Sequence, residues 1–523
     1  MRSSPVGPRV VVEFSPLSES EAEALVRARR RAGAPADAEV RVLKRSLDAR
    51  KRQRIGFRLE IGIYSRAGTP TAVAERLAPP PLVGRPAHVV VVGTGPAGTF
   101  AALRLTQAGV AVTLLDRGKP VQPRRRDLAE LTRGRLDPES NYCFGEGGAG
   151  TFSDGKLYTR SKDRLAVRSV LATLVDHGAP ADILVDSRPH IGSNRLPKVL
   201  IAMRTALLAG GVRYRWSEAV TELVVHEGRV VGVRTARGDE LGSDAVVLAT
   251  GHSARDVYEL CAQQGVALSP KAFAIGARVE HPQPFVDRLQ YGEAAGHPRL
   301  PAAFYECAVQ VKTSTTGERG VYSFCMCPGG WIVDASTEAG HLCVNGMSLS
   351  RRDSPLANSA LVVTVTPADY ADLEPGPLGG IAFQRRIEAA AFAAGGGDYA
   401  AAQQSLPDFL ANRPSQTTQR STYRPRTVPG SVRATLPLFV GDALAAALPR
   451  LGRQLPGFVS AQAHFVGVET RTSAPVRIER GADLQSTSHA GLYPAAEGAG
   501  YAGGIVSAAI DGLRIADAIL AAL

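Results

Sequence analysis

Two glycine-rich loops lie about four hundred residues apart in this chain, GTGPAG at Gly93–Gly98 and GAGYAGG at Gly498–Gly504. The first loop directly follows the strand-like run Val89–Val92 and precedes a helical stretch over Thr99–Gln107. A strand, a GxGxxG turn and a helix in this order open a βαβ unit that binds a dinucleotide, with the helix N-terminus facing the phosphates. The sequence therefore predicts a dinucleotide-binding α/β domain.

Each glycine of the first loop has its own expected role. Gly93 permits the tight turn, Gly95 lets the backbone approach the pyrophosphate, and Gly98 lets the helix pack closely on the strand. The next strand, Val110–Leu115, ends in Asp116, about twenty residues past the loop, where an acid accepts hydrogen bonds from an adenosine ribose. A plain turn between core elements is the alternative, but strand, loop, helix, strand and acid agree on a dinucleotide.

The second loop also matches GxGxxG, which raises the alternative of a separate NAD(P) site. Only about twenty residues follow Gly503, fewer than the roughly thirty of a βαβ unit. The loop is therefore expected to serve another part of the first ligand. A helix that starts at Gly504 or Ile505 would direct N–H groups and a positive dipole at the N1 and C2 carbonyl edge of a reduced flavin. Together the two loops predict one FAD site.

At 523 residues the chain exceeds what one hydrophobic core serves, so several domains are expected. The predicted fold class is α/β, with a Rossmann-type FAD-binding domain, an inserted α+β substrate or cap domain and a small N-terminal α/β module. We expect the module at 1–80, the FAD-binding domain at 86–265 and 456–523, and the inserted domain at 266–455. Within the module, strands are predicted at 9–14, 39–47 and 55–63 and a helix at 18–32, with Ser18 and Glu21 as a capping box.

The charge and composition of the chain limit which partners and which cellular location are expected. The formal net charge is +12, and the first 60 residues supply about half of it. A cluster at Arg27, Arg29, Arg30 and Arg31 could contact RNA, although such a run is usually a solvated helix face. The apolar C-terminal stretch is interrupted at 511, 514 and 517 by charges, so no membrane span is expected. Six cysteines in a chain without a secretory leader pattern predict a cytoplasmic protein with free thiols.

The segment NYCFGEGGAGTFSDGK, residues 141–156, carries five glycines among small hydroxyl residues between Phe144 and Phe152. This composition favours a backbone that wraps closely around a ligand, with a flexible surface loop as the alternative. Further on, AVVLATG at 245–251 marks a return of the chain to the cofactor sheet, and Glu227–Gly228 predicts a hairpin turn between strands at 220–226 and 230–235.

Six motifs occur in one order: NYCFGEGGAGTFSDGK, ATGHSARD, GARVEHPQ, FCMCPGG, VETRTSAPVRI and EGAGYAGGIVSAAIDG. On these motifs the chain resembles the bacterial FAD-dependent dehydrogenase family from about residue 40 onward. The resemblance implies FAD, an oxidoreductase activity and a single FAD domain of the glutathione-reductase type. The residues expected to bind the cofactor are Gly93, Gly95, Pro96, Ala97, Gly98, Asp116, Arg117, Gly147, Gly148, Gly150, Thr151, Ser153, Asp154, Gly155, Lys156, Val220, Thr250, Gly251, Glu497, Gly498, Gly500, Gly503, Gly504 and Ile505.

Cys325 and Cys327, in FCMCPGG, are the sharpest catalytic candidates, because a thiolate beside a flavin can exchange electrons with it. Redox pairs are more often spaced CxxC, and ordinary packing is the alternative. A zinc site would need two further ligands, such as Cys143 and Cys343, and no metal is expected.

Two histidines and one acid–base pair complete the catalytic candidates. His281 and His252 could transfer a proton near neutral pH, with structural roles as the alternative. Glu469 and Arg471 flank Thr470 and are expected to point the same way, as a salt bridge or an anion clamp. Lys156 could stabilise negative charge on a reduced flavin or lie on the surface.

The predicted function is that of an FAD-dependent oxidoreductase, a dehydrogenase or reductase that transfers a hydride between flavin N5 and a small organic substrate. Because the sequence shows no NAD(P) domain, electrons would pass through a transient NAD(P)H, a redox partner protein, a quinone or oxygen. Two alternatives are a flavin-dependent RNA-modifying enzyme that uses the basic N-terminal module, and a flavin-binding scaffold without turnover.

Overall fold

The structure is a computed structural model that describes residues 8–64, 76–314, 317–373 and 375–523. Its first layer is a parallel sheet of five strands in the order β22-β10-β4-β5-β6. The bounds are β4 His88–Val92, β5 Ala111–Asp116, β6 Arg213–Trp216, β10 Ala245–Leu248 and β22 Leu492–Pro494. Strands of this kind are buried on both faces, which explains why β4 is a run of four valines with no polar alternation.

Three helices pack together on one face of this sheet. Helix α2 (Pro96–Gln107) and helix α12 (Ile505–Ala522) pack side by side, with α5 (Leu196–Ala209) next to them. α2 begins three residues earlier than the sequence predicts, because Pro96 occupies the first turn, where its missing N–H and fixed φ are tolerated. Gly512 of α12 allows the contact, since a Cβ there would lie 2.1 Å from the Ala97 carbonyl oxygen.

A small antiparallel sheet of three strands is attached to the parallel sheet. It consists of β7 (Val220–His226), β8 (Arg229–Thr235) and β9 (Glu240–Gly242). The predicted hairpin turn is present, with φ values of 49° at Glu227 and 74° at Gly228, as a two-residue turn of this type requires. β9 was not predicted from the sequence, because its three residues show too little alternation to be recognised.

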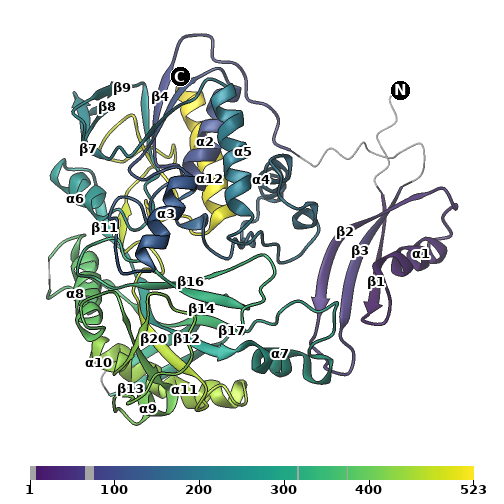
Figure 1. Ribbon diagram of the computed structural model, residues 1–523. Coiled ribbons are helices and arrows are strands. Elements are labelled where there is room, and N and C mark those ends of the chain that lie inside the picture. Colours follow the sequence, from purple (N-terminus) through teal and green to yellow (C-terminus); the bar gives the residue numbers. More distant parts are fainter. Residues whose placement is uncertain (1–7, 65–75, 315–316, 374) are drawn as a thin grey trace.

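A second unit is built on a mostly antiparallel sheet of seven strands in the order β13-β14-β17-β12-β20-β18-β19. Its long helix α11 (Leu438–Gln454) and helix α8 (Gly379–Ala394) cover the sheet and enclose the largest core (Figure 1). The strand bounds are β12 Phe273–Pro282, β13 Ala308–Thr313, β14 Gly317–Cys327, β17 Leu356–Val365, β18 Ala401–Ser405, β19 Thr427–Pro429 and β20 His464–Glu469.

The position of β20 corrects the expected end of the inserted domain at 455. β20 lies between β12 and β18, in the interior of the seven-stranded sheet, so the chain leaves this sheet only after Glu469. The sequence around 456–463 is rich in turn residues and resembles a linker, but it is a connection within the unit. The hairpin of β15 (Gly330–Asp334) and β16 (Val344–Ser348) extends from the same unit.

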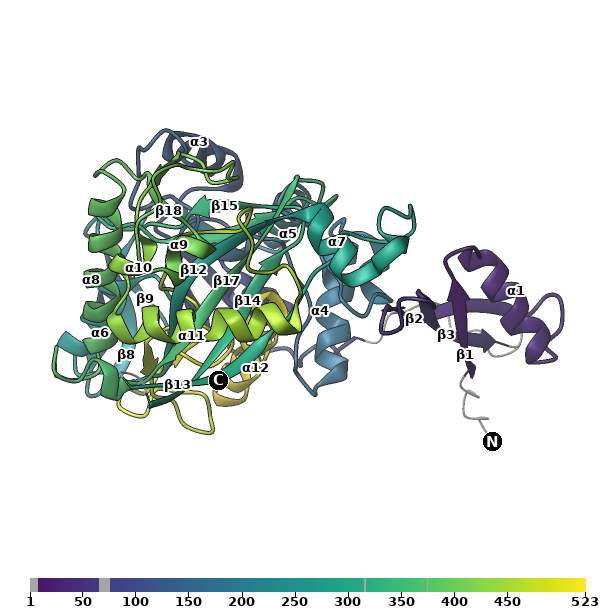
Figure 2. The ribbon, with the colours of Figure 1, turned by 90° about the horizontal axis from the view of Figure 1, so that it is seen from below.

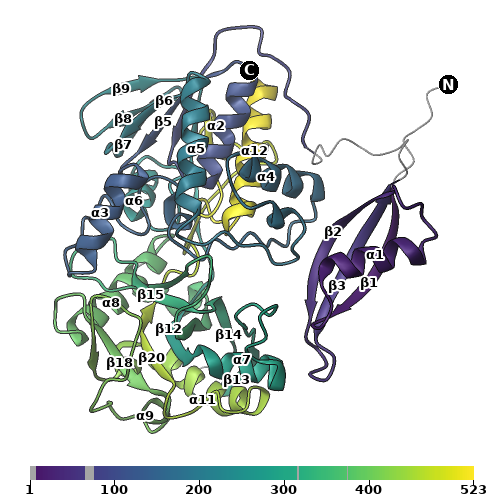
Figure 3. The same cartoon turned by 45° about the vertical axis from the view of Figure 1, so that its right-hand side comes forward.

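The N-terminal module projects from one side of the molecule (Figures 2 and 3). Helix α1 (Glu21–Arg31) packs on a sheet in the order β1-β3-β2, with bounds β1 Arg9–Pro16, β2 Glu39–Asp48 and β3 Gly56–Tyr64. The helix starts later than predicted, and its capping box is formed by Ser20 and Glu23 in place of Ser18 and Glu21. Arg45 connects the module to the main body through Asp186, at 2.7 Å. The α/β fold class predicted from the sequence is confirmed.

Candidate functional site

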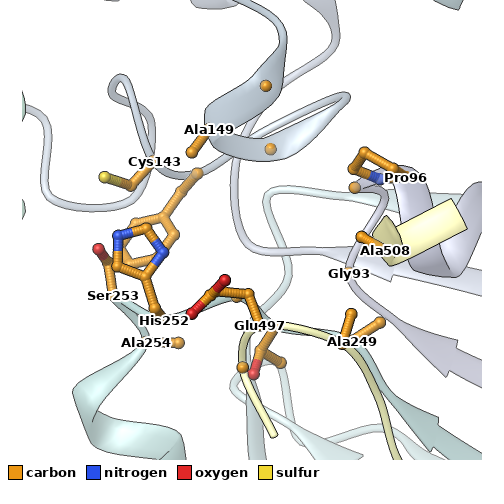
Figure 4. Close-up of a pocket in the computed structure, with 18 of the residues that line it drawn as sticks. Gly93, Pro96, Cys143, Ala149, Ala249, His252, Ser253, Ala254, Glu497 and Ala508 are labelled. Carbon is orange, nitrogen blue, oxygen red and sulfur yellow. The ribbon is translucent and has the colours of Figure 1, made fainter. Parts of the chain in front are cut away.

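A cavity of about 330 Å³ lies where the parallel sheet meets the seven-stranded unit. Its wall includes residues of the first glycine loop, the 143–156 loop, the 249–254 segment, the end of β14, and the second glycine loop with the start of α12. Figure 4 shows part of this wall, with Gly93 and Pro96 on one side and His252 and Cys143 on the other. Segments separated by about four hundred residues therefore share one site, as the two glycine loops predicted.

Two helices direct their N-termini at this cavity without a side-chain cap. The N-cap of α2 is Gly95 and that of α12 is Gly504, and neither helix has an acidic residue in its first turn. Gly95, Gly504 and Ile505 all line the cavity. Free N–H groups and the positive ends of two helix dipoles favour an anionic ligand at this place.

The glycines of the first loop differ in what surrounds them. A Cβ at Gly93 would lie 2.3 Å from the Ala249 carbonyl oxygen, and one at Gly98 would lie 2.0 Å from the Gly93 carbonyl oxygen. A Cβ at Gly95 would have no protein atom within 4 Å. Gly93 and Gly98 thus permit close backbone packing, whereas Gly95 leaves space in the cavity for a ligand, which fits the pyrophosphate of a dinucleotide.

Asp116 joins the first glycine loop to the 141–156 loop. One carboxylate oxygen accepts hydrogen bonds from the backbone N–H and the hydroxyl of Thr94, and the other accepts from the N–H groups of Gly118 and Gly145. Asp116 also lines the cavity. Its observed role is therefore to fix the backbone that surrounds the ligand, and a hydrogen bond to the ribose stays a prediction.

The 141–156 loop is anchored by Arg124, a residue of helix α3 (Val121–Leu131) that sequence reasoning missed. The buried guanidinium donates hydrogen bonds to four backbone carbonyl groups at distances of 2.7 to 3.0 Å, those of residues 141, 142, 146 and 148. Burial lowers the pKa of Arg124 to about 10. A lone arginine among exposed ones on a helix gives no sequence signal, because only the fold shows which of them is enclosed.

Most of the residues predicted to bind the cofactor line the cavity. Those that do are Gly93, Gly95, Pro96, Ala97, Asp116, Arg117, Gly148, Gly150, Ser153, Asp154, Gly155, Lys156, Val220, Thr250, Gly251, Glu497, Gly498, Gly504 and Ile505. Five lie behind it, and they shape the loops: Gly98, Gly147, Thr151, Gly500 and Gly503. For example, Thr151 donates its hydroxyl hydrogen to the Glu146 carbonyl oxygen at 2.6 Å. Residues such as Glu218, Ser253 and Asn345 line the cavity without having been predicted.

Cys325 and Cys327 converge on Lys156. The Lys156 Nζ atom lies 3.9 Å from the sulfur of each cysteine and 3.4 Å from the Asp154 carboxylate. Burial by itself would lower the pKa of Lys156, but the negative charges of Cys325, Cys327 and Asp154 raise it above its usual value. Lys156 and Cys325 both line the cavity, whereas Cys327 is buried behind them.

A β-bulge in β14 places the Cys325 side chain at the cavity. Phe324 pairs with Ala360 and Cys327 with Asn358, so one extra residue is inserted between the two pairs. Cys325 has a φ of 47°, in the left-handed region, which is unusual for a residue with a side chain. Phe324 and Cys325 would point to opposite faces of a regular strand, and at the bulge both line the cavity.

The expected Glu469–Arg471 pair is wrong, because each residue has a different partner. Glu469 accepts a hydrogen bond from Arg278 at 3.0 Å and lies outside the cavity lining. Burial raises the pKa of Glu469 to about 7, although Arg278 opposes this. The sequence signal for Arg278 was available, since it interrupts the apolar strand β12 with a charge that must find a partner inside the fold.

Arg471 lines the cavity and belongs to a buried ion network. It binds Glu388 of α8 at 2.7 Å, and Arg255 of helix α6 (Arg255–Gln263) binds the same carboxylate at 2.8 Å. Burial alone would raise the pKa of Glu388, but the two guanidinium groups together lower it below its usual range. The network joins the seven-stranded unit to α6 beside the parallel sheet, and so fixes the two parts of the cavity wall relative to each other.

Only one of the two histidine candidates lies at the cavity. His281 lies in the core of the seven-stranded unit, where its Nε2 is 2.9 Å from the Phe458 carbonyl oxygen and its ring stacks on Phe285. Burial lowers its pKa to about 4, and it does not line the cavity, so the structure does not support a catalytic role. His252 does line the cavity, beside the carboxylate of Glu497 (Figure 4).

The remaining expectations concern RNA, metals and membranes. Arg27 and Arg31 of the N-terminal cluster both form ion pairs with Glu13, which favours a paired surface over a free basic patch. Among the described residues, no group of three or more His, Cys, Asp or Glu side chains is placed to hold a metal ion. In the part of the chain that the structure describes, no helix is both long and apolar enough to span a membrane.

Comparisons with known proteins agree with this site. Residues 86–128 match the family described as "FAD binding domain", and residues 272–472 match "FAD-dependent protein, C-terminal domain-like". A protein of Clostridium beijerinckii, described as uncharacterized, is 40% identical over 497 residues, which cover 92% of each chain. The chain therefore belongs to one family with this protein, and it carries the two segments that match domains of FAD-dependent proteins. These two segments contribute the first glycine loop to one wall of the cavity and Cys325 to another.

Similarities to solved structures are weaker. CtdE in complex with FAD is 11% identical, covers 83% of this chain and 84% of its own, and has a TM-score of 0.33. The glycine oxidase of Geobacillus kaustophilus is 13% identical, with coverages of 83% and 95% and a TM-score of 0.34. The L-amino acid deaminase of Proteus vulgaris is 13% identical, with coverages of 85% and 96% and a TM-score of 0.33. At such low TM-scores these similarities do not indicate which reaction the chain catalyses.

Proposed function

We propose that the protein is an FAD-dependent oxidoreductase in which a hydride passes between flavin N5 and a small organic substrate in the cavity. The observation that carries this proposal is the meeting of two uncapped helix N-termini, those of α2 and α12, at one cavity that also reaches the seven-stranded unit. We further propose that this unit is the substrate or cap domain, and that electrons enter or leave through a transient NAD(P)H or a redox partner protein.

The chain offers distinct groups for the two halves of FAD. The N–H groups that follow Gly95 would bind the pyrophosphate, and the start of α12 at Ile505 would place its positive dipole beside the flavin ring. When bound, FAD supplies a two-electron acceptor or donor. Lys156 and Arg471 add two positive charges to the cavity wall, and these would stabilise an anionic reduced cofactor or an anionic substrate.

His252 is suited to hold a proton during the reaction. Burial lowers the pKa of His252, although the neighbouring Glu497 carboxylate partly opposes this. The imidazole is therefore neutral near pH 7 and can accept a proton from a substrate in the cavity, after which Glu497 would stabilise the imidazolium. Glu497 itself is held in place by the backbone N–H of Ala474, at 3.2 Å.

The Gly95→Val variant tests the proposed FAD site without disturbing the fold. Gly95 has a φ of −67° and no atom near the position of a Cβ, so valine is accepted by the protein but occupies the space left for the pyrophosphate. We expect the Kd for FAD to rise at least about thirtyfold, equivalent to about 2 kcal/mol, with an unchanged melting temperature of the apoprotein. The control is Gly84→Val, at a second glycine with open space. Equal FAD content in both variants would contradict the proposal.

A further inference from the structure

Two thiols of different accessibility lie together at the cavity wall. Cys325 is exposed, whereas Cys327 is fully buried. The Cys327 thiol donates a hydrogen bond to the Cys325 carbonyl oxygen at 3.3 Å, and the ammonium group of Lys156 lies 3.9 Å from each of the two sulfurs. Of the other free cysteines of the described chain, Cys143 is half-buried and also lines the cavity, whereas Cys261, Cys307 and Cys343 are buried. The pair therefore has a setting that packing alone does not require.

The two thiols also differ electrostatically. The neighbouring Cys327 thiol lowers the pKa of Cys325, and the positive charges of Lys156 and Arg278 lower it further, although burial opposes the shift. The neighbouring Cys325 side chain and burial raise the pKa of Cys327. Arg278 donates to the Cys325 carbonyl oxygen at 3.0 Å and approaches the Cys327 sulfur at 3.7 Å, so it fixes the bulge from behind. A thiolate that faces the cavity, with a protonated thiol beside it, has the form of an attacking and a resolving cysteine.

We propose that Cys325 and Cys327 form a reversible disulfide that carries two electrons between the bound flavin and a disulfide substrate in the cavity. This inference rests on the proposed binding of FAD and names the substrate class of the same site. Lys156 lies beside Cys325, and Arg471 lines the same cavity, which suits a disulfide that carries negative charge.

The chemistry balances in two steps. The Cys325 thiolate attacks a substrate R–S–S–R, a mixed disulfide forms, and one R–S⁻ leaves. Cys327 then gives its proton to a released thiolate and attacks the Cys325 sulfur, so that the internal disulfide forms and the second R–S group leaves. The substrate has gained two electrons and the protein has lost two. Two electrons and one proton from the reduced flavin restore the Cys325 thiolate and the Cys327 thiol, and a reduced nicotinamide supplies the flavin.

The first test uses the full-length, pre-reduced protein and 5,5′-dithiobis(2-nitrobenzoate), an anionic disulfide whose released thiolate is coloured. We expect the wild type and the Cys261→Ser control to release two thiolates per chain in the fast phase. A Cys327→Ser variant should release one and keep the probe as a mixed disulfide at Cys325, and a Cys325→Ser variant should lose the fast phase. Mass spectrometry of the wild type should then show an internal disulfide between residues 325 and 327.

The second test addresses Lys156 as a positioning residue. Lys156→Gln should slow the alkylation of Cys325 by iodoacetamide at pH 6 by about tenfold, because a smaller share of the thiol is ionised, and Lys156→Arg should restore most of the rate. The alkylation of glutathione added to the same samples serves as the reference. Equal rates in all three proteins would contradict the proposed role of the ammonium group.

Measurement of FAD content in every sample separates the two proposals. A protein that holds FAD but never forms the internal disulfide overturns the thiol proposal alone. A protein that forms the disulfide and never holds FAD overturns the proposed function, together with the transfer of electrons to flavin. If Cys325→Ser fails to fold, the mass of the oxidised wild type still decides whether the disulfide exists.

Discussion

The cavity has two walls that are built in different ways. The glycine wall, residues 93–97, 145 and 148–150, consists of backbone held in place by close packing and by Arg124. The thiol wall, Lys156, Cys325 and Cys327 with Arg278 behind them, consists of charged and ionisable side chains; Lys156 and Cys327 are 171 residues apart in the chain. A backbone wall needs the right local sequence, whereas a charged wall needs a partner for every buried charge.

The largest expected change in the free energy of unfolding follows from the loss of Arg124, which anchors the glycine wall. Arg124→Met leaves four carbonyl groups of the 141–148 segment without their donor, so we expect the free energy of unfolding to fall by about 3 to 5 kcal/mol. Arg125→Met is the matched control, since Arg125 is exposed on the next position of the same helix, and it should change stability by less than about 0.5 kcal/mol. Urea unfolding of both variants measures the difference. Similar values would mean that the loop supports itself.

The next effect concerns the buried charge behind the thiol wall. Glu469 has a pKa raised to about 7 in the fold, against an ordinary value of 4.5, so the folded state holds the proton more tightly than the unfolded state. The stability that this gives is fully present below pH 4.5 and is lost as the pH rises to about 7, a change of about 3 kcal/mol. Glu469→Gln should remove this pH dependence in urea unfolding from pH 4 to 8. The exposed Glu306→Gln is the control and should follow the wild type throughout.

The smallest effect distinguishes two glycines of the same loop. A methyl group at Gly98 meets the Gly93 carbonyl oxygen at 2.0 Å, whereas one at Gly95 meets nothing. Gly98→Ala should therefore lower the free energy of unfolding of the apoprotein by about 2 kcal/mol, and Gly95→Ala should leave it unchanged. Thermal unfolding without FAD measures both. If both variants lose the same stability, the space at Gly95 is not open in solution.

The glycine wall was predictable because its residues are neighbours in the chain. The spacing of Gly93, Gly95 and Gly98 after a run of valines is enough to predict a strand, a turn and a helix, and all three are present. The thiol wall was predictable only as a pair of cysteines. Neither Lys156 as their common neighbour nor Arg278 behind them could be inferred, because the contacts join strands and loops that only the sheet order brings together.

Contacts between residues far apart in the sequence also explain the predictions that the structure corrected. His281 and Glu469 have the chemistry of catalytic groups, but burial in the core of the seven-stranded unit gives them structural partners, Phe458 and Arg278. The end of the inserted domain was placed too early because β20 pairs with strands far away in the sequence, and a short buried strand carries no sign of its sheet.

By itself, the sequence determined the elements of the dinucleotide site, since backbone geometry at glycine and the hydrophobic period act over a few residues. The tertiary structure alone decided which charges meet. Arg278 pairs with Glu469, Arg471 pairs with Glu388, and Lys156 lies close to two thiols. Coulomb and hydrogen-bond energies depend on distance in space and on burial, and neither is written along the chain.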